Sequence, residues 1–330
     1  MEFVSSIAID NSNNCYVGMS SWGSAGIIVT FNSNSFTLNG TTDFLIVKHN
    51  STGDELWVKQ FGSNFEPFMH SEQFDGISTL IYDPFSNCLI LFGSFVSACN
   101  FGTVSLYSSP HNYQDVFIAK FDLEGNFIWV KKAGSDNMNQ PSTMSIDNEG
   151  NAYVLAMFPY GGNFDTIHVP NSGHLAKYDP EGNVLWVKKI FTNLNVGLHF
   201  PLYFLESKTI NESLYLTGYN IKSEFTVDTI SMSIPDYSDQ LIANFDLDGN
   251  IKWLKAIGGP IGTSLLKEID SDDLENIYIP GAFSGSYATF GIDTIFLDTG
   301  RGIYVAKYNK EGTLVWLKHA VTSNPKKTLL

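Results

Sequence analysis

The chain has 330 residues, 43% of them hydrophobic and 14% aromatic, which is enough to bury a sizeable core. Its 34 acidic residues outnumber the 19 basic ones, and the net charge of −15 would repel nucleic-acid phosphates and anionic lipid headgroups. We therefore exclude nucleic acid as a partner. No apolar run reaches the about 18 residues that a spanning helix requires, and the start of the chain lacks the basic and apolar regions of a signal peptide. We expect no membrane insertion and no leader in the sequence as it stands.

Each repeat of the sequence opens with two short strand-like segments, a and b, joined by a polar turn. In the first repeat, residues 4–10 turn through the Asn-rich residues 11–14 into residues 15–19. Four further pairs follow the same plan. They are residues 76–83 with 88–93, 144–147 with 152–155, 203–205 with 214–218, and 265–270 with 277–281.

A longer connection leads to the segment that repeats most closely, residues 115–131, which we interpret as a β-hairpin of strands c and d. Strand c is mostly apolar on both faces, so we expect it to be covered on both sides. The turn places Asp122 first, where its carboxylate accepts backbone N–H groups, and Gly125 where φ is positive. Each copy ends in Trp-(Val/Leu)-Lys. The other copies are residues 43–59, 173–188, 239–255 and 302–318.

Five such units predict a repeat fold. A lone four-stranded sheet cannot bury both faces, whereas radial stacking of several sheets can. We therefore predict an all-β, five-bladed β-propeller with four-stranded antiparallel blades, forming a single domain over residues 1–330. An open arc cut from a larger ring is the alternative. The repeats cover approximately residues 4–62, 74–134, 144–191, 203–258 and 266–320.

The pattern D-x-(F/L)-(I/L)-(V/A)-K-x-(D/N)-x-x-G-x-x-x-W-(V/L)-K, followed by an (I/L)-D turn and Y-(V/L)-x-G, resembles the SBBP-type β-propeller repeat. Asp-Thr-Ile pieces at Asp165, Asp228 and Asp293 fit that family too, and the match covers nearly the whole chain. The resemblance implies a scaffold of unassigned role, often secreted or exposed on the bacterial cell surface, and its name implies seven blades where we count five. A weaker resemblance to PQQ-type propeller repeats supports tryptophan packing between blades and implies no quinone cofactor.

The recurring tryptophans are expected to pack between blades because each occupies the same place on an apolar strand. A carbohydrate-stacking platform is the other interpretation. The Lys two residues later is expected to lay its stem across the ring. Hairpin chemistry explains the acidic turns, so we expect no metal and no cofactor. The tryptophans are Trp57, Trp129, Trp186, Trp253 and Trp316.

Three cysteines, Cys15, Cys88 and Cys99, form an odd set without CxxC spacing, which argues against a disulfide framework and against a structural zinc site. We expect buried thiols that pack as small hydrophobic side chains. A disulfide between Cys88 and Cys99 is the alternative.

The long b–c and d–a connections should share one face, and variable surface of this kind commonly carries function. Residues that break the repeat there are candidates for contact with a ligand, in which an aromatic ring and amides suit a glycan. Ordinary loop packing and solvation are the competing explanation. The candidates are Trp22, Tyr160, His70, Asn137, Asn139 and His199.

From these observations we expect a monomeric, non-catalytic extracellular binding, adhesion or scaffold propeller that contacts a glycan or protein. A structural spacer within a larger surface protein is the first alternative. A glycoside-active enzyme is the second, and it requires two non-repeated carboxylates that converge. Since no known catalytic motif is present, we expect no enzyme. The carboxylates that break the pattern are Glu66, Glu72, Glu206, Glu224 and Glu268.

Overall fold

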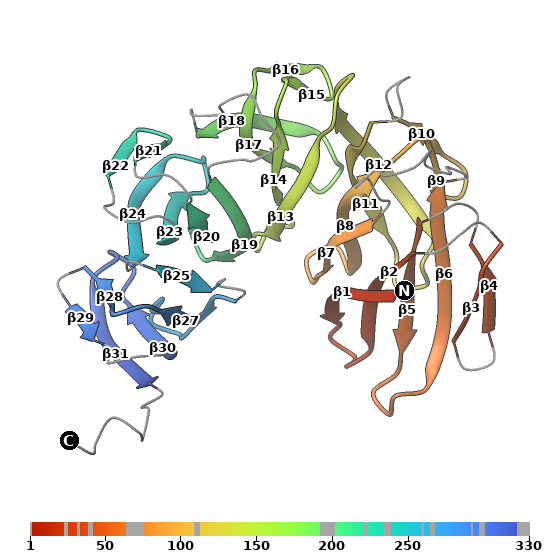
Figure 1. Cartoon of the computed structure of the whole chain (residues 1–330). Helices are drawn as coiled ribbons and strands as arrows, with labels where there is room; N and C mark the ends of the chain where they lie inside the picture. Colours follow the sequence, from red (N-terminus) through yellow and green to blue (C-terminus); the bar gives the residue numbers. More distant parts are fainter. Residues whose placement is uncertain are drawn as a thin grey trace. The chain divides into compact units, whose positions relative to one another are not determined.

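The computed structural model contains β-strands, turns and bends over the residues it describes, and no helix among them (Figure 1). The chain divides into two compact units, residues 1–188 and 189–330. No helix long and apolar enough to cross a bilayer occurs in the part of the chain that is described. The described residues are 2–22, 26–31, 34–38, 42–63, 76–108, 113–191, 202–220, 224–233, 239–258, 261–264, 268–291, 293–296 and 301–321.

Three antiparallel sheets and one separate hairpin make up the first unit. The first sheet runs in the order β1 (Glu2–Ile9), β2 (Cys15–Trp22), β5 (Thr42–His49), β6 (Glu55–Ser63), β9 (Ala98–Asn100) and β10 (Ser105–Tyr107). The second runs in the order β7 (Gly76–Asp83), β8 (Cys88–Phe95), β11 (Asp115–Phe121), β12 (Phe127–Gly134), β15 (Gly162–Phe164) and β16 (Ile167–Val169). The third contains β13 (Gln140–Ile146), β14 (Ala152–Phe158), β17 (Ser172–Tyr178) and β18 (Val184–Phe191), and the hairpin is β3 (Ile28–Phe31) with β4 (Asn34–Thr37).

The second unit holds two further sheets and a hairpin of the same kind. The hairpin, β21 (Glu224–Val227) with β22 (Ile230–Ser233), pairs through Val227 with Phe191 at the end of β18. The fourth sheet runs β19 (Leu202–Ile210), β20 (Ser213–Asn220), β23 (Asp239–Asp246), β24 (Ile251–Gly258), β28 (Tyr287–Phe290) and β29 (Asp293–Phe296). The last contains β25 (Ile261–Ser264), β26 (Asp270–Ser271), β27 (Ile277–Ser284), β30 (Arg301–Tyr308) and β31 (Leu314–Val321).

The all-β, antiparallel fold is confirmed, but the prediction of four-stranded sheets is wrong. In the second to fifth repeats, part of the long b–c connection folds into a short hairpin that joins strand d of the preceding repeat. In the first sheet, for example, Gly62 of β6 pairs with Asn100 of β9. The hairpin supplies partners to backbone groups that an edge strand would otherwise leave open. The alternating pattern of strands a to d predicted the inner four strands and carried no signal for the added pair.

The c–d hairpins are stabilised by hydrogen bonds within their turns, as the sequence predicts. Asp122 Oδ1 accepts the backbone N–H groups of Glu124 and Asn126 at 3.0 and 2.8 Å, and Gly125 has a φ of 75°. Every residue of β11 is buried, which confirms that this strand c is covered on both faces. Cys88 and Cys99 are buried free thiols, so no disulfide joins them in this structure.

Neighbouring sheets of one unit bury their facing side chains against each other. Between the first two sheets, phenylalanines from both form one cluster, with ring centroids 5.3 Å apart for Phe44 and Phe117 and 4.9 Å apart for Phe61 and Phe121. In the second unit, Ile242 and Ile257 of the fourth sheet share a cluster with Ile277 of the last. Each such ring or branched chain contributes about 1.5–3 kcal/mol by leaving water.

A recurring contact, which we call the Trp–turn contact, also joins successive repeats. The Trp of one strand d donates its indole N–H to the carbonyl oxygen of the second residue in the next c–d turn, and its ring lies against the turn glycine. The hydrogen bonds are Trp57 to Leu123 (3.3 Å), Trp129 to Pro180 (3.2 Å) and Trp253 to Lys310 (2.9 Å). A Cβ added at the glycine would meet the same ring, at 3.1 Å for Gly125, 2.9 Å for Gly182 and 2.8 Å for Gly312.

Candidate functional site

The predicted ligand contacts divide into those that the structure describes and those that it does not. Tyr160 lies in the turn between β14 and β15, with 53% of its surface exposed, and is followed by Gly161, whose φ is 81°. The Gly161 N–H donates to the Phe158 carbonyl at 3.2 Å, so the turn that presents the ring is fixed. The side chains of Trp22, His70 and His199 lie outside the described residues.

Asn137 and Asn139 lie around a buried carboxylate. The Asn139 amide donates to Asp115 Oδ1 at 2.8 Å and to the Asn137 carbonyl at 2.7 Å, and Lys132 Nζ lies 3.1 Å from Asp115 Oδ2. Burial raises the pKa of Asp115 above its usual value, against the lowering effect of Lys132 and these hydrogen bonds. We predicted that Asn139 contacts a ligand at the surface. The structure corrects this prediction, because the Asn139 side chain is fully buried and donates a hydrogen bond to Asp115.

A second set of buried charges was missed in the sequence. In three repeats, the Lys of strand c faces the Asp that begins the a–b turn. The Nζ to Oδ2 distances are 3.6 Å for Lys120–Asp83, 3.6 Å for Lys177–Asp147 and 2.9 Å for Lys307–Asp272. Because nearly all of these groups have little exposed surface, the pairs belong to the framework rather than to a binding surface.

Tyrosine completes this arrangement in most repeats. Tyr153 Oη donates to Asp147 at 3.0 Å, and Tyr278 Oη donates to Asp272 at 2.9 Å. The hydrogen bond from Lys307 is the main cause that holds the pKa of Asp272 well below its usual range. The signal for these groups is present in the sequence as a recurring Asp, Tyr and Lys, and it is lost in the fourth repeat, where Asn244 replaces the Lys.

Two of the non-repeated carboxylates lie near each other in the second unit. Glu206 is on β19, Glu268 precedes β26, and an ion pair of 2.7 Å between Lys208 Nζ and Asp270 Oδ1 joins the same two segments. Burial, and then the negative charge of Glu268, raise the pKa of Glu206 to about 7. A carboxyl group with this pKa can donate or accept a proton near neutral pH. Glu66 and Glu72 lie outside the described residues.

Thr217 adds a polar group beside Glu206. It is fully buried, it lies directly across from Glu206 in the β19–β20 register, and its hydroxyl has no hydrogen-bond partner within the described part of the chain. Directly opposed residues of an antiparallel pair have neighbouring side chains on one face. This part of the fourth sheet therefore combines an acid of raised pKa with an unused hydroxyl.

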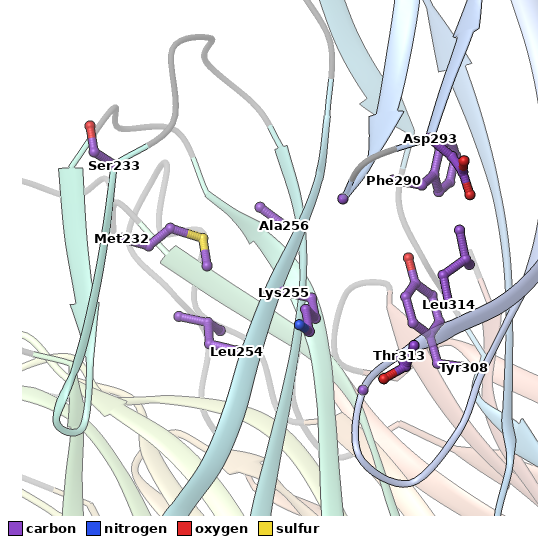
Figure 2. Close-up of a pocket in the computed structure, with 12 residues that line it drawn as sticks. Met232, Ser233, Leu254, Lys255, Ala256, Phe290, Asp293, Tyr308, Thr313 and Leu314 are labelled. Carbon is purple, nitrogen blue, oxygen red and sulfur yellow. The ribbon is translucent and has the colours of Figure 1, made fainter.

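A groove of about 620 Å³ opens at another place in the second unit, between β22, β24, the β28–β29 hairpin and the last c–d turn. Figure 2 shows its labelled side chains, among them Leu254, Tyr308 and Leu314, with Lys255 and Asp293 as the charged groups. Burial, with a further contribution from Asp293, raises the pKa of Tyr308, so its hydroxyl stays protonated. The groove offers both apolar and charged groups to a small molecule.

Comparison with known proteins finds a relative in sequence and similar solved structures. The chain is 26% identical over 227 residues, 58% of its length, to an uncharacterized WD repeat-containing protein, L264, of Acanthamoeba polyphaga mimivirus. That match spans only 16% of the mimivirus protein. No family model matches the chain. The WD repeat-containing relative agrees with the related sheets of the structure in indicating a repeat protein.

One of the similar solved structures is a GH43 endo-arabinanase from Bacillus licheniformis. It is 14% identical, with 94% of this chain and 96% of that chain covered and a TM-score of 0.39, a likeness too low to assign an activity. It nevertheless corrects one expectation. The sequence led us to expect no enzyme; the protein found in this comparison is an enzyme, so the exclusion of catalysis is withdrawn.

Proposed function

We propose that the chain is a five-bladed, SBBP-like propeller protein that binds a glycan or protein ligand at the surface formed by its b–c connections, in a secreted or cell-surface setting. Tyr160 carries this proposal. Its ring is exposed on a fixed turn, at a place where the repeats differ. The repeated Asp, Trp and Lys side chains, in contrast, are engaged within the framework, so selectivity must come from residues outside the repeat.

A glycan array and a pull-down of surface proteins test this proposal, each with the wild type and Tyr160→Ala. Loss of an exposed aromatic contact typically weakens binding by more than about 1 kcal/mol, or roughly fivefold or more. Phe85→Ala is the matched control, because Phe85 is an exposed aromatic residue, at 63%, in the turn between β7 and β8 and outside the b–c connections. Equal binding by the wild type and Tyr160→Ala, or no ligand at all, would favour a structural spacer.

Glycoside hydrolysis is a second candidate, and Glu206 favours it because its raised pKa suits a general acid. The nearby Glu268 would supply the second carboxylate. Glu206→Gln and Glu268→Gln should each lower the rate of hydrolysis of a susceptible polysaccharide by about 100-fold or more. Glu224→Gln, at an exposed glutamate on β21, should leave the rate unchanged. Activity that survives both substitutions would exclude this pair.

A further inference from the structure

The groove of about 620 Å³ in the second unit lies where one added hairpin meets the next c–d turn. The hairpin is β28–β29, and the turn leads into Leu314 of β31. The same meeting of hairpin and turn occurs one repeat earlier, between β21–β22 and Ile251 of β24. This earlier place, which we call the reference place, allows the groups that line the groove to be compared with their equivalents in the same chain.

At the reference place, the backbone of one repeat binds a carboxylate from the hairpin of the repeat before it. Asp228 lies in the turn of β21–β22 with a φ of 51°, and its Oδ2 accepts the backbone N–H of Ile251 at 3.2 Å. A hydrogen bond to an ionised acceptor is stronger than one between neutral groups. The backbone at this place is therefore suited to a carboxylate.

The groove has the same backbone arrangement but a glycine in place of the aspartate. Gly291, with a φ of 71°, stands at the position of Asp228 in the hairpin turn. Leu314 stands at the position of Ile251, and both Gly291 and Leu314 line the groove. A Cβ added at Gly291 would meet no described atom within 4 Å. The space that the Asp228 side chain fills at the reference place is therefore open to a ligand.

A lysine supplies positive charge to the same groove. Lys255 of β24 is half-buried, and its stem lies against the next turn, because a Cβ added at Gly312 would come within 3.1 Å of the Lys255 Cε. Its ammonium group forms no ion pair with a residue that the structure describes. The packed stem limits where the ammonium group can lie, and the unpaired charge favours an anion there.

Asp293 and Tyr308 add polar groups that differ from those of the reference place. Asp293 stands at the position of Ile230 in the earlier hairpin. Tyr308 stands at the position of Phe245. Burial, and then the charge of Asp293, raise the pKa of the Tyr308 hydroxyl, so these two groups lie near each other. With Lys255 and Asp293, the groove holds one cation and one anion that are not paired with each other, which suits a ligand carrying both charges.

Apolar side chains line the groove between these charges. Figure 2 shows Met232 and Leu254 on one side and Phe290 and Leu314 on the other. Leu254 and Phe290 are 6% and 1% exposed, so both are held firmly by the packing of their own sheet. A ligand bound through its charged groups can therefore bury an apolar body against these side chains.

We propose that this groove binds a free amino acid with an apolar side chain. The carboxylate of the amino acid takes the place of the Asp228 carboxylate, accepts the N–H of Leu314 and pairs with Lys255. The ammonium group faces Asp293, and the side chain lies between the apolar walls. A carboxylate without an ammonium group binds less well, because Asp293 repels it. The proposal does not depend on the surface at Tyr160, which belongs to the first unit.

Isothermal titration calorimetry with L-phenylalanine is the first test. L-phenylalanine should bind with a Kd of about 1 mM or lower. L-phenylalaninamide, which lacks the carboxylate, and 3-phenylpropionate, which lacks the ammonium group, should each bind about tenfold more weakly. A wild type that does not bind L-phenylalanine, or that binds all three compounds equally, would overturn the proposal.

Three substitutions test whether binding occurs in the groove. Gly291→Asp introduces the side chain of the earlier hairpin, which Asp228 shows to be compatible with a positive φ, and should weaken binding by about tenfold or more because it fills the carboxylate site. Lys255→Gln should weaken binding by about tenfold. Asp293→Asn should weaken the binding of L-phenylalanine and strengthen that of 3-phenylpropionate, since it removes an attraction in the first case and a repulsion in the second.

Lys318→Gln is the matched control for these variants. Lys318 is the exposed lysine at the equivalent position of β31, it does not line the groove, and its substitution should leave binding unchanged. Circular dichroism verifies that each variant is folded. Binding of L-phenylalanine that is unchanged in Gly291→Asp, or an effect of Asp293→Asn in the same direction on both compounds, would contradict the proposed site.

Discussion

The second and fourth repeats differ in the residues that stand at the strand-c Lys position and at the start of the a–b turn. In the second, Lys120 and Asp83 form an ion pair whose side chains are 5% and 0% exposed. In the fourth, the neutral Asn244 occupies the position of the Lys, and the a–b turn, Asn211-Glu212, has no Asp. Both charges are absent together. The comparison indicates that the Lys and the Asp are kept or lost as a pair. A buried charge without its partner destabilises the fold by more than the ion pair stabilises it.

Removing one charge of the second repeat gives the largest expected effect. Lys120→Met should lower the free energy of unfolding by about 3–5 kcal/mol, because Asp83 stays fully buried without a cation. Urea unfolding measures the loss. The double variant Lys120→Met/Asp83→Asn, which lacks both charges as the fourth repeat does, should recover most of the lost stability. A double variant as unstable as the single one would show that the loss does not come from leaving Asp83 without its partner.

Adding a charge to the fourth repeat should be costly for the same reason. Asn244→Lys places an ammonium group at a fully buried position that lacks the Asp of the other repeats, and we expect a loss of about 2–4 kcal/mol. Asn244→Met serves as the control of similar length without a charge. If the Met variant loses as much stability as the Lys variant, side-chain size rather than charge explains the effect.

The tyrosine hydroxyl beside the a–b turn also differs between repeats that have the turn Asp and the fourth repeat, which lacks it. Tyr153→Phe removes a 3.0 Å hydrogen bond to Asp147 and should cost about 1.5–3 kcal/mol, as expected for a bond to a charged acceptor. Tyr215→Phe, at the equivalent position of the fourth repeat, should cost about 0.5 kcal/mol or less because the turn Asp is missing there. Thermal unfolding of the two variants in parallel gives the difference. Equal losses would show that the carboxylate contributes nothing to the tyrosine's role.

The fourth repeat should also depend on pH through Glu206. Since its folded pKa of about 7 lies above the ordinary value of 4.5, its contribution to stability is complete below about pH 4.5 and is lost as the pH rises through 7. Glu206→Gln should therefore stabilise the protein at pH 8 by roughly 1–2 kcal/mol, after allowance for its partial exposure, and have little effect at pH 4. Chemical unfolding at both values checks this. If the free energy of unfolding of Glu206→Gln varies with pH as that of the wild type does, the raised pKa of Glu206 is excluded.

Much of the framework follows from local sequence patterns. The Asp–x–x–Gly turns and the apolar strand c are short-range features, so residues 115–131 predict their own hairpin and its coverage. The added hairpins do not follow from such patterns, because their pairing partner lies in another repeat. β9, for instance, is only three residues long and is stabilised by β6. Its sequence alone contains too little alternation to indicate a strand.

The candidate sites were harder to predict than the framework. Tyr160 could be singled out because it breaks the repeat, but Asn139 breaks it too and proves to be buried. Burial depends on the neighbouring Asp115, 24 residues away, whose environment no local pattern reports. The pKa of Glu206 likewise depends on Glu268, which belongs to the following repeat. Properties that arise between repeats need the three-dimensional arrangement.

In the second to fifth repeats, the hairpin that joins the preceding sheet sets an order for synthesis on the ribosome. Strand β6 ends at Ser63, yet the strands that cover its outer edge, Ala98–Asn100 and Ser105–Tyr107, emerge only later. At about 5–20 residues per second, that edge waits roughly 2–9 s for its partner. An exposed edge strand is prone to wrong pairing during such an interval. A fragment meant to fold as the first sheet should therefore extend to Tyr107, beyond the nominal end of its repeat.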